Sequence, residues 1–456
     1  MIEMNKEIFK AYDIRGIYPD DLDEELIYKI GRAYADMLKE ETKKDKVTFV
    51  VGRDMRLSSP QLTKELIRGI TDQGVNVINI GLASTPTFYY GVSILDADGG
   101  MQVSASHNPK EYNGIKLVKS RAFPVGFDTG IEEILNRVIA DDFVKSEKKG
   151  LISKNNEILD KHVEYALSST DIDRIKPLKV VADAANSMGA PYLEKLFEKL
   201  PGELIKMNFE LDGTFPAHEA DPYKEENIVD LKKRVLAEGA DLGIATDGDG
   251  DRIFFIDDTG ELVDPAIIRG MLSKIVLEKN QGATICYDIR PGRITRDMIV
   301  ENGGKPCVTR VGHSLIKAKG IEEGAKFAGE SSGHFFFDTK YGFFETPDLV
   351  TLKMLAEISK EDKKFSEIIK PLQRYYHSGE INSEVEDKEG VMKKLVKIYK
   401  DAKDISLLDG VTIEFDDFWF NVRPSNTEPK LRLNLEAISR DIMEEKRDEI
   451  LKVIRG

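Results

Sequence analysis

The chain is poor in cysteine and in long apolar runs. It has two cysteines among 456 residues, Cys286 and Cys307, and both lie in apolar, strand-like segments. Such a chain fits a reducing compartment, and we expect both thiols to be buried and reduced. No stretch approaches the roughly 20 apolar residues that span a bilayer. The first residues also lack the basic start and apolar run of a secretory signal. We therefore expect a cytoplasmic protein without a membrane partner.

Positive charge is also scarce. The 66 Lys and Arg residues are outnumbered by 81 Asp and Glu residues, which gives a formal net charge of −15. Nucleic-acid binding needs a basic face, so we expect no nucleic-acid partner. An anionic ligand such as a phosphate would have to be attracted locally, by Arg, Lys, backbone N–H groups or a metal ion.

What the sequence does contain is a repeated strand–helix–strand pattern. In segments that begin near residues 47, 178 and 283, a β-branched apolar run ends in a polar cluster with Asp, and an amphipathic helix and another strand follow. Such βαβ units form mostly parallel sheets covered by helices. The tail alternates short strands and helices and contains a hairpin, which is typical of an α+β domain.

We therefore predict an α/β protein of four domains around a central cleft. Three tandem similar α/β domains with mixed, mostly parallel sheets cover residues 1–152, 153–257 and 258–371, and a C-terminal α+β domain covers 372–456.

The strongest local signal is the segment DLGIATDGDGDRIFFID, in which Asp247, Asp249 and Asp251 alternate with glycines between two apolar runs. In a glycine-loosened loop these carboxylates can converge on one hard cation. The calcium-binding EF-hand pattern fails, because Arg252 and Asp258 stand where Gly and Glu are required. A haloacid-type phosphatase would need Thr or Val in place of Asp251. A solvated acidic turn is the alternative, although ionised carboxylates between buried strands are costly.

The segment MQVSASHNPKEYNGIKLV raises the question of a serine nucleophile. In a regular strand, adjacent side chains point to opposite faces, so His107 is not expected to serve as a base for Ser106. No G-x-S-x-G elbow is present, which disfavours a serine hydrolase. A serine that handles phosphoryl groups needs only positioning, a metal and cationic partners. The alternation does not distinguish Ser104 from Ser106.

Three other loops carry polar clusters. RPSNTEPKLR suits a phosphate, AGESSGHFFFD suits neighbouring sugar hydroxyls, and RVGHSLIKAKG places His313 at the start of a helix. Each of these segments alone is more typical of an ordinary polar turn or helix cap.

Together, SASHNP, DGDGDR, GESSGH and RPSNTEP, with YDIRG, GRD and STPT, resemble the α-D-phosphohexomutase superfamily, in particular its phosphomannomutase/phosphoglucomutase branch. The resemblance runs from about residue 9 to about residue 435. It implies an isomerase that moves a phosphoryl group between C1 and C6 of mannose or glucose phosphate. The route would pass through a phosphoserine and a hexose 1,6-bisphosphate, which also acts as activator.

The resemblance also implies roles for single residues. Ser106 would carry the phosphoryl group, and its oxygen would complete a Mg²⁺ site with Asp247, Asp249 and Asp251. General acid–base candidates are Lys116 and His313. The implied substrate-binding residues are Tyr12, Arg15, Arg252, Glu330, Ser332, His334, Arg423, Ser425, Asn426 and Thr427.

Two departures from the family pattern stand out. Ser104 replaces a frequent Thr, and Lys340 and Tyr341 lie where an Asp-Asp-Gly turn is common. A phosphoglucosamine mutase is the first alternative, disfavoured because Asn426 stands where that branch more often has Gly. A sugar-phosphate hydrolase and a non-catalytic sugar-phosphate binder are the others. We expect a monomer or small homo-oligomer.

Overall fold

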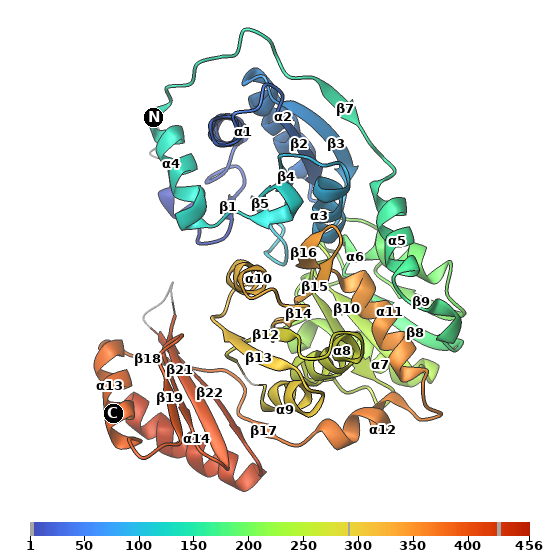
Figure 1. Cartoon of the computed structure of the whole chain (residues 1–456), viewed down its shortest axis with the longest axis vertical. Coiled ribbons are helices and arrows are strands. Elements are labelled where there is room, and N and C mark those ends of the chain that lie inside the picture. Colours follow the sequence, from blue (N-terminus) through green and yellow to red (C-terminus); the bar gives the residue numbers. More distant parts are fainter. Residues whose placement is uncertain (1–3, 291, 426–429) are drawn as a thin grey trace. The chain divides into compact units, whose positions relative to one another are not determined.

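The computed structural model describes residues 4–290, 292–425 and 430–456. The chain divides into two compact units, one formed by Met1–Val263 and His334–Ser366, the other by Asp264–Gly333 and Glu367–Gly456. Figure 1 follows the chain through both units, from blue to red. Within the described ranges, no helix combines the length and the apolarity needed to cross a membrane.

The first sheet of the first unit is mixed. Its strands lie in the order β1-β5-β4-β2-β3-β7, and β6 pairs with β5. β2 is parallel to β3 and β4, whereas β5 is antiparallel to β1 and β4. The strands are β1 (Ile14–Ile17), β2 (Thr48–Arg53), β3 (Asn76–Leu82), β4 (Gly99–Val103), β5 (Tyr112–Lys119), β6 (Phe123–Pro124) and β7 (Ile152–Lys154).

Successive residues of a strand point to opposite faces of a sheet. Apolar residues of β2 lie on both faces of this sheet, and helices cover both. Phe49 and Val51 of β2 belong to one core, shared with α1 (Glu24–Thr42), α2 (Ser59–Asp72) and α4 (Ile131–Ala140). Val50 belongs to a second core, shared with Phe88 of α3 (Thr85–Ile94). The blue helices α1 and α2 lie beside the sheet in Figure 1.

The second sheet of this unit has the order β11-β10-β8-β9. β8 is parallel to β9 and β10, and β10 forms an antiparallel hairpin with β11. Both hairpin strands are buried throughout, so the loop between them is held at a fixed place. The elements are α5 (Ile158–Ser168), β8 (Leu178–Asp183), α6 (Gly189–Phe197), β9 (Gly202–Met207), α7 (Val229–Glu238), β10 (Leu242–Thr246) and β11 (Ile253–Asp257). An antiparallel pair, β15 (Phe335–Thr339) and β16 (Gly342–Glu345), and α11 (Pro347–Ile358) complete the unit.

The second unit begins with a third βαβ arrangement. β12 is parallel to both β13 and β14. The elements are α8 (Pro265–Lys279), β12 (Thr284–Asp288), α9 (Arg293–Glu301), β13 (Lys305–Thr309), α10 (His313–Glu322) and β14 (Phe327–Gly329). Cys286 and Cys307 are free thiols at paired positions of β12 and β13. Cys286 is buried as expected, but Cys307 is only partly buried, because β13 is an edge strand.

The C-terminal part of the second unit is an antiparallel sheet in the order β17-β22-β21-β20-β19, with β18 also paired to β22. Leu395, Ile450 and Ile454 of its two long helices share one core with the strands. The boundary between the two units falls within α12 (Phe365–Ile369). The elements that follow are β17 (Tyr376–His377), β18 (Ile381–Glu384), α13 (Lys388–Ile398), β19 (Asp404–Ser406), β20 (Val411–Glu414), β21 (Phe418–Pro424), β22 (Lys430–Ala437) and α14 (Arg440–Arg455). Short 3-10 helices cover Lys6–Ile8, Ser120–Ala122, Phe127–Thr129, Ile172–Arg174, Glu225–Asn227 and Lys370–Leu372. The predicted order of three α/β domains and a C-terminal α+β domain is confirmed.

Candidate active site

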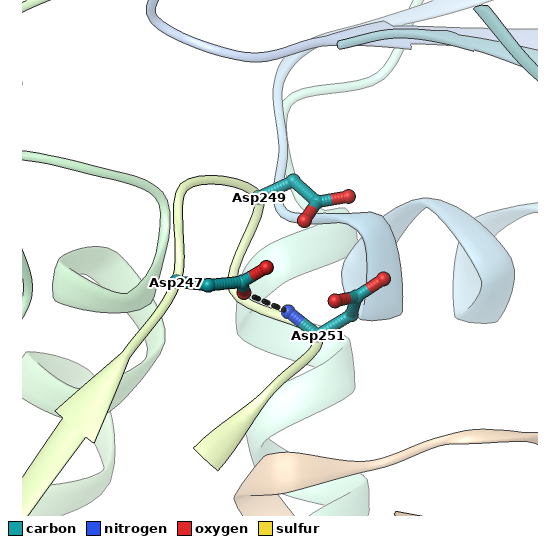
Figure 2. A group of neighbouring side chains, drawn as sticks. All are labelled: Asp247, Asp249 and Asp251. Carbon is teal, nitrogen blue, oxygen red and sulfur yellow. Dashed lines mark hydrogen bonds between the residues drawn. The ribbon is translucent and has the colours of Figure 1, made fainter. Parts of the chain in front are cut away.

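The acidic loop connects β10 to β11. Asp247, Asp249 and Asp251 are all buried, and each offers a carboxylate oxygen within 4.8 Å of the other two. Figure 2 shows the three side chains gathered on one side of the loop. The convergence depends on glycine: Gly250 has φ +70°, a conformation that L-residues with side chains rarely adopt.

A buried lysine balances part of this charge. The Nζ atom of Lys116, on β5, lies 2.6 Å from Asp249 Oδ2 and 2.5 Å from Asp251 Oδ2. Thr85 Oγ1, at the start of α3, donates a hydrogen bond of 2.5 Å to the same oxygen of Asp249. Residues of β5 and α3, which are distant in sequence from each other and from the acidic loop, therefore meet at this loop.

The carboxyl groups differ in how readily they ionise. Burial raises the pKa of Asp247 well above its usual value, and the charges of Asp251 and Asp249 add to that effect. Burial also opposes ionisation of Asp251, but Lys116 and His334 outweigh it and hold the pKa of Asp251 well below its usual range. The environment thus favours the ionised form of Asp251 and disfavours that of Asp247.

The donor set fits a divalent cation that prefers oxygen ligands, such as Mg²⁺. Buried carboxylates are stable as anions only when they are paired or bound to a metal. Asp249 Oδ1 is buried and has no hydrogen-bond partner among the described residues. Three convergent carboxylates without sulfur or imidazole ligands are typical of Mg²⁺ or Ca²⁺ sites.

Ser106 lies in the loop after β4, which ends at Val103. Its Oγ donates a hydrogen bond of 3.0 Å to Asp247 Oδ2, and its backbone N–H donates to Ser104 Oγ at 3.0 Å. Ser106 has φ +51°, so the chain is not extended here. The structure therefore places Ser106 in direct contact with the acidic loop, and Ser104 accepts a hydrogen bond from its backbone.

The prediction that His107 would point away from Ser106 is wrong. The two residues lie outside the strand, so the alternation rule does not apply, and His107 Nδ1 lies 3.2 Å from Ser106 Oγ. Burial, followed by the nearby charges of Arg252 and Arg15, lowers the pKa of His107 well below its usual value. The imidazole is therefore neutral at pH 7 in this environment.

Three basic residues of the same unit lie close to this centre. Arg15 Nη1 donates to Asn108 Oδ1 at 2.7 Å and to the carbonyl oxygen of Ala105 at 3.2 Å. His334 Nε2 lies 3.2 Å from Asp251 Oδ1, and Arg252 Nε lies 3.4 Å from His334 Nε2. The structure thus brings Arg15, Arg252 and His334 together with the serine and the acidic loop. Tyr12 is partly buried in the bend that precedes β1.

The second unit contains the predicted sugar-binding pair. Glu330, which follows β14, is buried, and its Oε1 accepts a hydrogen bond of 2.9 Å from the backbone N–H of Gly312. Ser332 Oγ donates to Glu330 Oε2 at 3.4 Å. His313 follows Gly312 and opens α10, so the structure brings Glu330, Ser332 and His313 into one neighbourhood.

The predicted phosphate loop lies at the end of β21. Arg423 Nη2 donates to Glu380 Oε2 at 2.7 Å. Burial opposes ionisation of Glu380, but Arg423 and Arg432 outweigh it and lower the pKa of Glu380. Ser425 is buried, and its N–H donates to the carbonyl oxygen of Lys430 at 2.9 Å. The predicted partners Asn426 and Thr427 lie outside the described residues.

Sequence reasoning missed several residues that support the site. Thr85 lies in STPT, noted only as part of the family resemblance, and Arg56 lies two residues after GRD. Nothing local in the sequence indicates the contacts of either residue. Asp288, at the end of β12, also went unpredicted. Its carboxylate accepts hydrogen bonds from Arg269, Arg290 and the backbone N–H of Ser331, and so anchors the loop that carries Glu330.

The chain combines a buried acidic loop that faces a serine with tandem α/β domains and a C-terminal α+β domain. We compared its sequence with models of known protein families. Four models match consecutive parts of the chain, described as phosphoglucomutase/phosphomannomutase alpha/beta/alpha domain I (residues 6–145), domain II (160–260), domain III (265–375) and the C-terminal domain (380–453). The chain belongs to the phosphoglucomutase/phosphomannomutase family.

Individual relatives match this chain over nearly its whole length. A phosphomannomutase of Vibrio cholerae is 37% identical over 456 residues, which cover 98% of each chain. A phosphomannomutase/phosphoglucomutase of Pseudomonas syringae is 37% identical over 438 residues, covering 94% of this chain and 91% of that protein. The crystal structure of a family protein from Burkholderia thailandensis matches with a TM-score of 0.91 and 31% identity, covering 99% of this chain and 97% of that one.

Proposed function

We propose that the chain interconverts the 1- and 6-phosphates of mannose, glucose or both, by way of a phosphoserine at residue 106. The single observation that carries this proposal is the 3.0 Å hydrogen bond from Ser106 Oγ to Asp247, one of three convergent buried carboxylates. Family membership supports the same activity. The relatives named above include both a phosphomannomutase and a protein named for both activities, which is why we keep both sugars.

Two phosphoryl transfers complete the reaction. In the first, the bond between phosphorus and Ser106 Oγ breaks while a bond to a free hexose hydroxyl forms, which gives a hexose 1,6-bisphosphate. In the second, the other phosphoryl group moves to Ser106 Oγ, which leaves the isomeric monophosphate. Each acceptor hydroxyl gives its proton to a base, and each departing oxygen receives one from an acid.

Asp247, Asp249 and Asp251, with an oxygen on Ser106, would hold Mg²⁺. When bound, Mg²⁺ would neutralise the charge that develops on the transferring phosphoryl group. Burial opposes protonation of Lys116, but Asp249 and Asp251 outweigh it and raise its pKa well above the usual value. Lys116 is therefore a cation and hydrogen-bond donor at the acidic loop, and it stays a candidate for general acid–base work. His313 is the acid–base candidate of the second unit.

Several groups of residues are proposed to recognise the substrate. Glu330 and Ser332 suit the 3- and 4-hydroxyls, which nearly interchange when the sugar turns over. The non-reacting phosphate would bind the loop of Arg423, Ser425, Asn426 and Thr427. The proposed further contacts are Tyr12, Arg15, Arg252 and His334. The domain boundaries given above, a cytoplasmic location and a monomeric or small homo-oligomeric state stay predictions.

A substrate panel tests the proposal. The enzyme is incubated with glucose 1-phosphate, mannose 1-phosphate or glucosamine 1-phosphate, with Mg²⁺ and a trace of glucose 1,6-bisphosphate. We expect the 6-phosphates of glucose and mannose and no inorganic phosphate in proportion to substrate consumed. Stoichiometric phosphate release would show a hydrolase, and turnover of the glucosamine phosphate alone would show the sister activity. Either result would overturn the proposal.

A further inference from the structure

Arg56 is fully buried in the loop between β2 and α2 and binds four backbone carbonyl oxygens of the loop that carries Ser106. Its Nη2 donates to the carbonyl oxygens of Ser106 at 2.8 Å and Asn108 at 2.5 Å. Its Nη1 donates to those of Pro109 at 2.6 Å and Tyr112 at 2.9 Å. One guanidinium group thus holds the whole turn from the end of β4 to the start of β5.

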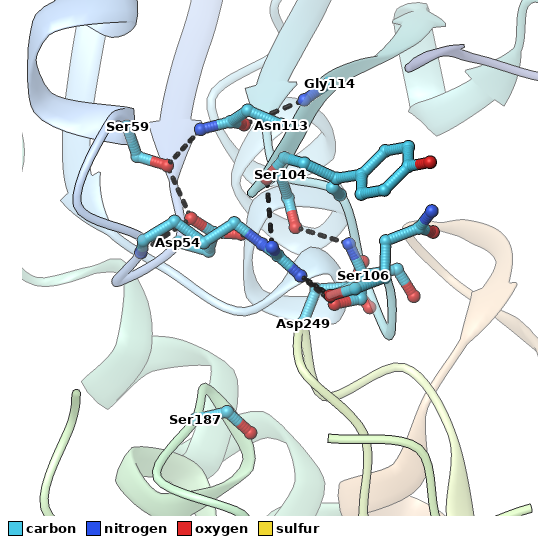
Figure 3. Close-up of polar contacts among 12 residues, drawn as sticks. Asp54, Ser59, Ser104, Ser106, Asn113, Gly114, Ser187 and Asp249 are labelled. Atoms are coloured by element: carbon cyan, nitrogen blue, oxygen red, sulfur yellow. Dashed lines mark hydrogen bonds and ion pairs between the residues drawn. The ribbon is translucent and has the colours of Figure 1, made fainter. Parts of the chain in front are cut away.

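Arg56 is itself held in place. Its Nε lies 3.2 Å from Asp54 Oδ2, and both side chains are fully buried. Asp54 Oδ1 accepts a 2.5 Å hydrogen bond from Ser59 Oγ, and Ser59 Oγ accepts one of 3.0 Å from Asn113 Nδ2. Figure 3 shows this chain of hydrogen bonds beside Ser106. On another side, the guanidinium carbon lies 5.1 Å from the ring centroid of Phe215.

The anchored turn needs such support. Ser106 has φ +51°, which a residue with a side chain adopts only when its surroundings impose it. The carbonyl oxygen of Ser106 is also packed against Gly248, where an added Cβ would lie 2.2 Å away. Arg56 and the acidic loop therefore fix the backbone of Ser106 together, and this backbone determines where Oγ points.

We propose that Arg56 is a positioning residue for phosphoryl transfer: it holds the Ser106 turn so that Oγ faces the acidic loop. This inference rests on the proposed phosphoserine function. The planar fork of arginine provides donors in two directions at once, and a lysine in its place has a single ammonium group that cannot reach all four oxygens. Substitution should therefore affect the transfer step more than substrate binding.

The test uses Arg56→Lys and Arg56→Met in the full chain, with Phe215→Leu as the matched control. Phe215→Leu removes the ring that packs on the guanidinium and leaves the four hydrogen bonds to the turn. Three quantities are measured: phosphoryl uptake from glucose 1,6-bisphosphate by intact-protein mass, kcat and KM. Hydrogen exchange of the amides in residues 104–114 reports the order of the turn, and far-UV circular dichroism reports folding.

We expect kcat and the uptake rate to fall roughly 100-fold in Arg56→Lys, which is the loss typical of a reacting group displaced by about 1 Å. The KM should stay within about threefold of the wild-type value. Amide exchange in the turn should quicken in Arg56→Lys and stay slow in Phe215→Leu, which keeps kcat within about threefold. If Arg56→Met does not fold, Arg56→Lys carries the test.

Two results would overturn the inference: wild-type kcat and uptake in Arg56→Lys, or an equal loss in Phe215→Leu. A different result, wild-type protein that never takes up phosphate, would instead overturn the proposed function. The two failures are thus distinguishable.

Discussion

Lys116 balances part of the negative charge of the acidic loop, and its removal should be costly. Its Nζ lies within 2.6 Å of carboxylates of both Asp249 and Asp251, and the three side chains are at most 4% exposed. Removal of one partner of a buried ion pair destabilises a protein by about 3–5 kcal/mol, because the remaining charge is buried without compensation. We expect Lys116→Met to lose about that much free energy of unfolding in EDTA.

Mg²⁺ should restore part of this loss. In the wild type, the ammonium of Lys116 competes with a cation for the same carboxylates, so the variant should gain more from added Mg²⁺. A ligand at 100 times its Kd stabilises a protein by about 2.7 kcal/mol. Urea denaturation followed by far-UV circular dichroism, with EDTA and with Mg²⁺, measures both quantities.

Lys119→Met is the matched control. Lys119 lies on the same strand, but its Nζ pairs at 2.7 Å with Glu41, and that pair is partly exposed to solvent. Exposed pairs contribute about 0–1 kcal/mol. A loss below 1 kcal/mol in Lys116→Met, or an equal gain from Mg²⁺ in both variants, would refute this electrostatic reasoning.

Three other predictions follow from single contacts. Gly248→Ala should slow phosphoryl uptake at least tenfold, because its Cβ would lie 2.2 Å from the carbonyl oxygen of Ser106; uptake within about threefold of wild type would contradict this. Burial lowers the pKa of His162, outweighing Asp348, so its contribution to stability is present above about pH 6.5 and is lost as the pH falls. His162→Gln should therefore flatten the acid side of the stability profile, by at most about 1.4 kcal/mol per pH unit. Burial also acts to lower the pKa of His218, but the hydrogen bond to Asp183, the charge of Asp183 and the hydrogen bond to the backbone of Glu219 together outweigh burial and raise it. His218 therefore stabilises the protein below about pH 6.5 and loses that effect as the pH rises, so His218→Gln should change the profile in the opposite sense. Denaturation midpoints between about pH 5 and about pH 8 check both histidines, and changes of the same sign would count against the assignment.

The fold was accessible from the sequence because its signals are local. The β-branched runs at residues 48–53, 178–183 and 284–288 are each followed by an amphipathic helix, and all three are parallel strands in the structure. The metal-site candidates were accessible for the same reason, since all three aspartates lie within five residues of one loop.

Contacts between distant segments were not accessible. Lys116 and Asp251 are 135 positions apart, and no local pattern indicates their ion pair. The prediction for His107 was wrong because it assumed an extended strand. Ser106 instead adopts φ +51°, and no glycine at this position indicates that conformation in the sequence. That conformation depends on the buried guanidinium of Arg56, whose hydrogen bonds join residues 50 to 56 positions apart in the chain.

Covalent phosphorylation of Ser106 is the most direct test of the account. The purified protein is stripped of phosphate, incubated with glucose 1,6-bisphosphate and Mg²⁺, and examined by intact-protein mass and peptide mapping. Wild-type and Ser104→Ala proteins should each gain one phosphoryl group on Ser106, and Ser106→Ala should gain none. Phosphate on Ser104, or full mutase activity in Ser106→Ala, would contradict the central claim.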